Sequence, residues 1–125
     1  MRRTILVGLA ALALSACESN PWVIEAEAAV APPNLYYQWF DQVARCMRRP
    51  EHATRARFDL IRWRTGVEIE HPTKGQAWGL WTEPHQITVR SDKSEVELVV
   101  KHELVHDLLQ DPEHPPPHFE RCAGR

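Results

Sequence analysis

The sequence has no excess of positive charge, no hydrophobic segment long enough to cross a bilayer, and only three cysteines. Its 15 lysines and arginines are outnumbered by 17 aspartates and glutamates, and no basic patch of the kind that binds nucleic acid is present. The arginines between positions 45 and 57 are typical of a solvated surface. The longest apolar run, residues 5–14, has about ten residues, roughly half of what a spanning helix needs. The 125 residues fit one domain.

The apolar run has the features of a targeting segment. Arg2 and Arg3 precede it, and residues 14–17 follow it with the sequence Leu-Ser-Ala-Cys. This order of parts resembles the lipobox of bacterial lipoproteins, in which the cysteine is acylated and becomes the new N-terminus. The resemblance implies that residues 1–16 are a signal peptide and that lipid on Cys17 anchors the protein in the bacterial cell envelope, facing the periplasm or the outer membrane. An ordinary secretory signal is the alternative.

The other two cysteines, Cys46 and Cys122, form an even pair once Cys17 is assigned to lipid. In an oxidising compartment such a pair favours a disulfide bond. The bond would close a loop of about 77 residues and would stabilise the fold by up to roughly 4.5 kcal/mol if chain entropy alone is counted. Two buried free thiols are the alternative.

The most informative motif is residues 102–106, which have the form H-E-x-x-H. Residues four apart on a helix lie on one face, so His102 and His106 can bind the same metal ion. Zinc suits this pair, in a tetrahedral site that keeps one position for water. Glu103 can take a proton from that water as the water attacks a carbonyl group. The motif is the signature of zinc metallopeptidases, and two structural histidines are the alternative.

The segment around the motif is predicted to form a buried helix. Ser94 and Glu97 have the spacing of a capping box, which predicts that the helix starts at Ser94. Apolar residues then occupy most positions of Val96–Leu109, a pattern typical of a helix that is buried on all sides. Pro112 predicts that the helix ends near Gln110.

The mature chain is predicted to consist of a tether and an α+β domain. Residues 17–33, rich in alanine, glutamate and proline, are expected to link the lipid to a domain spanning residues 34–125. The spacing of apolar residues predicts a first helix over Asn34–Arg49 and strands over Phe58–Trp63, Val67–Glu70 and Ile87–Arg90. The tail after the H-E-x-x-H helix is expected to be irregular.

This order of elements, together with the motif, resembles a minimal zincin, in which a helix and a small twisted sheet pack with an H-E-x-x-H helix. The resemblance implies that a strand edge above the metal pairs with extended substrate. Ile87–Arg90 is the candidate for that edge. Trp78 and Trp81 would line or border the pocket, or would simply pack in the core.

A catalytic zinc usually has three protein ligands, so a third is expected after His106. The candidates in the tail are Asp111, Glu113, His114, His118 and Glu120. His114 is the first imidazole after the predicted end of the helix, and the three prolines that follow it would stiffen the loop. His114–Phe119 also resembles the tails of SprT-like metallopeptidases, where a histidine and then a phenylalanine follow the motif. Both arguments favour His114, with His118 as the alternative.

The roles of other polar groups stay open. His118, Arg121, Tyr36 and Tyr37 are candidates for stabilising an oxyanion, and Asp107 and Glu97 could be hydrogen-bonding partners of the histidines.

The sequence thus predicts an envelope-anchored zinc metallopeptidase that acts on a peptide or protein. Glu103 would be the general base, His102, His106 and His114 would bind zinc, and no nucleic acid would be involved. A non-catalytic lipoprotein that uses zinc for structure or for binding a partner is the alternative. A third reading is a peptidase that acts on cell-wall peptides.

Overall fold

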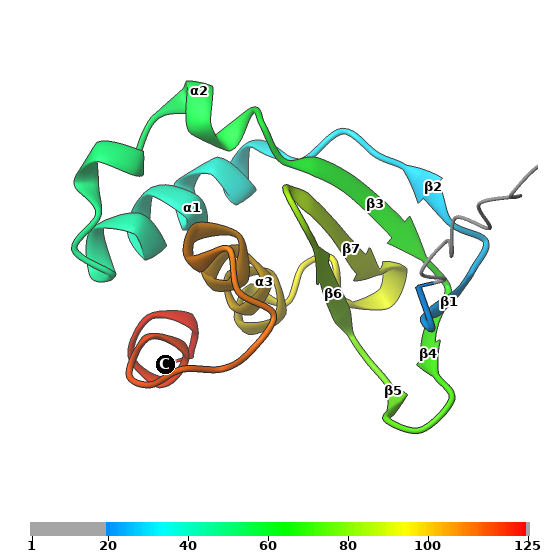
Figure 1. The fold of residues 1–125 in the computed structure, drawn as a ribbon. Helices are drawn as coiled ribbons and strands as arrows, with labels where there is room; N and C mark the ends of the chain where they lie inside the picture. The colour runs from blue at the N-terminus through cyan, green and yellow to red at the C-terminus, as the bar shows by residue number, and fades with distance from the viewer. Residues whose placement is uncertain (1–19, 125) are drawn as a thin grey trace, which may run out of the picture.

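The computed structural model describes residues 20–124, so the predicted signal peptide and the predicted lipid site at Cys17 lie outside the described residues. The chain has an α+β fold, which confirms the predicted fold class. Helix α3 lies at the centre, with α1 on one side, a four-stranded sheet on the other and the C-terminal turn against it (Figure 1). Within the described range, no helix is both long enough and apolar enough to span a bilayer.

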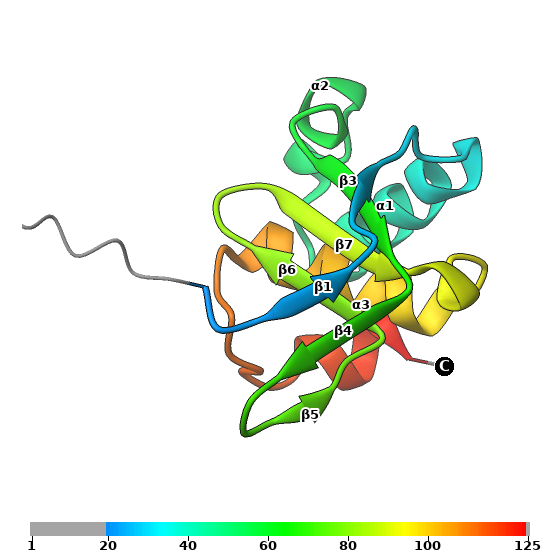
Figure 2. The same ribbon diagram turned by 90° about the vertical axis from the view of Figure 1, so that its right-hand side faces the viewer.

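The helices are α1 (Asn34–Cys46), α2 (Arg55–Phe58) and α3 (Glu97–Leu109), and a π-helical turn, η3, covers Phe119–Ala123. The four-stranded sheet has the order β2 (Ala28–Ala29), β3 (Arg62–Gly66), β7 (Gln86–Arg90) and β6 (Gly79–Thr82). A three-stranded sheet has the order β1 (Val23–Glu25), β4 (Glu68–His71) and β5 (Gly75–Gln76). Figure 2 views the molecule from the side of this smaller sheet.

The core forms where α1 and the larger sheet enclose α3. The buried face of α1 includes Trp39, Phe40 and Val43, which follow helical spacing. Helix α3 buries Val100 and Leu104 completely. Because α3 has neighbours on several sides, its sequence carries apolar residues around most of its circumference rather than along one stripe.

The predicted start of the H-E-x-x-H helix was too early, because the N-cap is Val96, two residues after Ser94. The Ser94 hydroxyl donates a hydrogen bond to the Ser91 carbonyl oxygen (3.1 Å), inside a 3-10 turn at Ser91–Lys93. The helix starts at Glu97, after Val96, with no side-chain cap. It ends where Gln110 adopts a left-handed conformation (φ 55°), which confirms the predicted end.

The strand predicted as the sheet edge is instead central. β7 pairs with β3 in parallel and with β6 in antiparallel orientation, so β6 is the edge that lies against α3. Three consecutive residues of β7, Ile87, Thr88 and Val89, are almost completely buried. A continuous run of β-branched residues is typical of a strand that is covered on both faces, and this is the signal for a central position.

Part of the predicted tether belongs to the folded domain. β1 pairs with β4, and β2 pairs with β3. The ring of Trp22 also packs edge-on against that of His71, with centroids 4.9 Å apart. The domain therefore begins well before Asn34, the boundary that the sequence predicted.

The predicted disulfide bond between Cys46 and Cys122 is present, with the two Cα atoms 5.7 Å apart. It joins the last residue of α1 to the η3 turn. Since no other covalent link holds the tail within the described residues, the bond and the packing of η3 on α3 together position this end of the chain.

Replacing both Cys46 and Cys122 by serine should lower the free energy of unfolding by up to about 4.5 kcal/mol, because the unfolded chain regains the entropy of the open loop. Urea unfolding of the variant and of the non-reduced wild type measures this difference. Wild-type protein in excess reductant should match the variant. Equal unfolding midpoints for all three samples would contradict the prediction.

Candidate functional site

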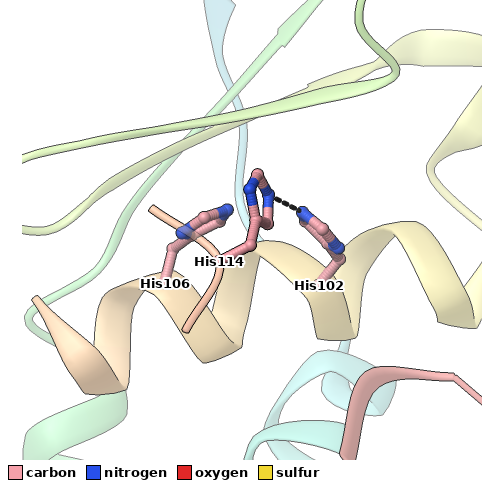
Figure 3. A group of neighbouring side chains, drawn as sticks. All are labelled: His102, His106 and His114. Carbon is pink, nitrogen blue, oxygen red and sulfur yellow. Dashed lines mark hydrogen bonds between the residues drawn. The ribbon is translucent and has the colours of Figure 1, made fainter. Parts of the chain in front are cut away.

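Three histidine side chains converge beside α3. His102 and His106 lie one turn apart on α3, and His114 reaches them from the loop that follows the helix (Figure 3). One ring nitrogen from each histidine lies within 4.8 Å of those of the other two, so these residues could hold a metal ion. The Nε2 atoms of His102 and His114 are 3.1 Å apart. The structure brings His114 to the pair, whereas His118 is not part of the group.

The tautomer of His106 is set by the backbone. Its Nδ1 lies 2.8 Å from the carbonyl oxygen of Asp111, which can only accept a hydrogen bond. Nδ1 therefore carries the hydrogen, and the lone pair of Nε2 is available for a metal. A ring oriented by a hydrogen bond through its other nitrogen is the common arrangement for a metal-binding histidine.

The two helical histidines are held in the neutral form. Burial, together with the neighbouring His106 and His114 rings, lowers the pKa of His102 to about 4. Burial also lowers the pKa of His106. Neutral imidazole is the form that binds metal, so at pH 7 neither residue needs to lose a proton before an ion binds.

The ring of Phe119 packs against all three imidazoles. Its ring centroid lies 4.6 Å from that of His106 and 4.8 Å from those of His102 and His114. Phe119 opens the η3 turn, and Cys122 of the same turn is bonded to α1. The disulfide therefore anchors the segment that packs against the three rings.

Glu103 lies between α3 and the edge strand β6. It is only 6 % exposed, and burial raises its pKa to about 8, although the nearby backbone N–H of Trp81 acts in the opposite direction. A Cβ atom at Gly79 would lie 2.8 Å from Cγ of Glu103 and 2.9 Å from Oε1. Only glycine at position 79 lets β6 approach this closely.

A cleft of about 550 Å³ opens along β6 beside this group of residues. His102, Glu103, His106 and His114 line it, together with all of β6 and with Asn20 and Trp22 of the N-terminal segment. A smaller hollow of about 390 Å³, lined in part by Trp78 and Leu98, adjoins it beyond Gly79.

Some backbone N–H and C=O groups of β6 do not form hydrogen bonds with the neighbouring strand β7. The N–H of Arg90 in β7 donates to the carbonyl oxygen of Trp78 (2.8 Å), so Trp78 faces β7. In an antiparallel ladder the facing residues alternate, so the N–H and C=O groups of Gly79 and Trp81 point away from β7.

The buried carboxylate of Asp107 has several polar partners, and the three histidines are not among them. The side chain is fully buried, and its carboxylate accepts from the indole Nε1 of Trp81 (3.0 Å) and pairs with Nη1 of Arg57 (2.7 Å). Nδ1 of His85 lies 3.1 Å from the same carboxylate. Glu97, the other predicted partner, is exposed and pairs with Lys101.

The predicted oxyanion groups lie elsewhere. Tyr36 is buried in the core and donates to the carbonyl oxygen of Ser94 (2.6 Å). Tyr37, His118 and Arg121 are not among the residues that line the cleft. Trp81 lines the cleft and Trp78 lines the adjoining hollow, in agreement with the pocket reading of the sequence. Gly79 carries no local sequence signal for its place beside Glu103, because the contact between β6 and α3 is long-range.

The site therefore combines three imidazoles that could hold a metal ion with a buried carboxyl group and an open strand edge. No protein-family model, curated protein or solved structure matches this chain.

Proposed function

We propose that this protein is a zinc-dependent peptidase of the bacterial envelope. The observation that carries the proposal is the convergence of His102, His106 and His114 beside the buried carboxyl group of Glu103. Three imidazole ligands leave a fourth position of a tetrahedral zinc ion open, which is the arrangement of a catalytic rather than a structural site. A purely structural ion would have no use for an acid at position 103.

The chain's own residues account for the handling of protons. Bound zinc supplies Lewis acidity, which polarises a carbonyl group and lowers the pKa of water. Glu103 accepts the proton of the attacking water and later donates it to the leaving amine. Its pKa of about 8 without a metal falls in the presence of a nearby cation, because the cation favours the charged carboxylate. The charged carboxylate is the form that accepts a proton.

The shape of the cleft favours an extended peptide as substrate. The outward N–H and C=O groups of Gly79 and the outward C=O group of Trp81 offer hydrogen bonds to a strand laid alongside β6, whereas the N–H of Trp81 faces Glu103. The indole N–H of Trp81 is already used by Asp107, so its side chain is available only for packing. The hollow beside Trp78 and Leu98 gives room for side chains of such a peptide.

The position of the N-terminal segment supports action close to a membrane. Asn20 lines the cleft and follows the predicted lipid site, Cys17, by only three residues. Three residues span about 10 Å at most. Lipid on Cys17 would therefore hold the cleft near the bilayer surface, where membrane-associated peptides or proteins are the substrates within reach.

Removal of zinc from the mature protein should abolish peptide hydrolysis, and added zinc should restore it. The measurement uses protein without residues 1–16, with its disulfide intact, before and after dialysis against a chelator. Metal analysis should find one zinc ion per chain in the active form, and cleavage of unfolded casein should follow the zinc content. Hydrolysis that persists in metal-free protein would contradict the proposal. Zinc binding without hydrolysis of casein, a peptide library or a muropeptide digest would favour a non-catalytic zinc lipoprotein.

A further inference from the structure

We infer that Trp81 is a positioning residue that fixes the general base and one metal ligand relative to each other; this inference rests on the proposed peptidase function. Its backbone N–H faces the Glu103 carboxyl group and is close enough to lower the pKa of that group. Its indole ring lies nearly parallel to the His106 imidazole, at an interplanar angle of 14° with the ring centroids 6.2 Å apart. Its indole N–H donates to Asp107 (3.0 Å). One residue of β6 thus contacts three residues of α3.

The three contacted residues share one face of the helix. Glu103, His106 and Asp107 are spaced by three and four positions, which places them side by side on α3. Trp81 therefore joins the edge strand to the helix at the point where the base and a ligand meet. A shift of β6 relative to α3 would move the Glu103 carboxyl group and the His106 ring out of their present relation.

The indole ring is itself held in place. Its N–H bond ends on a carboxylate that is fully buried and that also pairs with Arg57 and lies next to His85. Rotation of the ring would remove one hydrogen-bond donor from the buried carboxylate. The free-energy cost of leaving a buried charged group without a partner exceeds the net contribution of the hydrogen bond itself. The ring orientation is consequently fixed by chemistry outside the cleft.

Trp63, a core tryptophan that lies outside the cleft, serves as the control for Trp81. Trp63 in β3 is 4 % exposed, like Trp81 at 7 %, and packs against the rings of Tyr36 and Phe58. It does not line the cleft. If Trp81 only filled the core, replacing either tryptophan would have the same consequences for metal and substrate.

The experiment compares Trp81→Phe with Trp63→Phe in the mature, disulfide-bonded protein. Trp81→Phe keeps the backbone N–H and an aromatic ring but removes the bond to Asp107. We expect the dissociation constant for zinc to rise about tenfold or more, in the range typical of groups that orient metal ligands. With zinc saturating, kcat should fall while KM changes less than about twofold, because the base and not the substrate is displaced. Trp63→Phe should change neither quantity beyond about twofold at a comparable loss of stability.

The dissociation constant for zinc can be measured without any peptidase activity, so failure of this inference can be distinguished from failure of the proposed function. If the two variants change the zinc affinity and kcat equally, or if Trp81→Phe raises KM alone, Trp81 is not a positioning residue, and the proposed function is untouched. If the wild type binds no zinc, the proposed function and this inference fail together. Should Trp81→Phe not fold, Trp81→Met, which fills the space with a flexible apolar chain and no N–H donor, gives the same test.

Discussion

Replacing Glu103 by glutamine should lower the rate of peptide hydrolysis by about 10²- to 10⁴-fold, the range expected when a general base is removed. Glutamine has nearly the shape of glutamate but cannot accept and return a proton at neutral pH. The histidines are unchanged, so the zinc content should stay at the wild-type level. Steady-state cleavage of a casein-derived peptide and metal analysis of the same sample measure both quantities.

A second glutamate on the same helix provides the control. Glu97 is exposed, pairs with Lys101 and lies six residues before Glu103, outside the cleft. Glu97→Gln should leave both the rate and the zinc content unchanged. A Glu103→Gln protein that retains wild-type activity would rule out the proposed base, and one that loses its zinc would mean that Glu103 holds the metal rather than the proton.

The same variant should fold well. In the metal-free protein the folded-state pKa of Glu103, about 8, lies above the ordinary value of 4.5. The folded chain then binds more protons than the unfolded chain between these two values, so its stability falls as the pH rises through this window. Glutamine at position 103 removes this loss. Metal-free Glu103→Gln should therefore be at least as stable as the wild type at pH 8.

Much of the α3 region follows from local sequence. The pair His102 and His106 needs only helical spacing, and the end of α3 near Gln110 follows from Pro112 two residues later. The choice of His114 as third ligand also came from short-range reasoning, since the helix end and the next imidazole are close in the chain. The Cys46–Cys122 bond was predictable from the cysteine count and the expected oxidising compartment, although its connection to the three histidines through Phe119 was not.

The sheets were harder to predict because strand order depends on residues far apart in the chain. The zincin resemblance places Ile87–Arg90 at the edge, yet its continuous β-branched run indicates a strand covered on both faces. The alanine- and proline-rich flanks of Val23–Glu25 predict a tether, and they carry no signal for the pairing of this segment with β4. The approach of Gly79 to Glu103 likewise has no local signature.

Replacing Asp107 by alanine should lower the free energy of unfolding by about 3–5 kcal/mol, the usual cost of removing one partner of a buried ion pair. The Arg57 side chain, 14 % exposed, would keep its charge without the carboxylate, and the indole N–H of Trp81 would lose its acceptor. Folded domains are stable by only about 5–15 kcal/mol in total. A large share of the variant should therefore unfold at a urea concentration that leaves the wild type intact.

The exposed ion pair of Arg55 and Asp59 provides a control that distinguishes the loss of a buried carboxylate from a general loss of negative charge. Its side chains are 57 % and 59 % exposed, so Asp59→Ala should cost less than about 1 kcal/mol. Both variants remove one aspartate that pairs with an arginine of α2, which makes them closely matched. Urea unfolding at constant pH measures the two costs side by side. Equal costs would mean that the buried carboxylate at position 107 contributes no more than a surface charge, and that β6 is held on α3 by apolar packing alone.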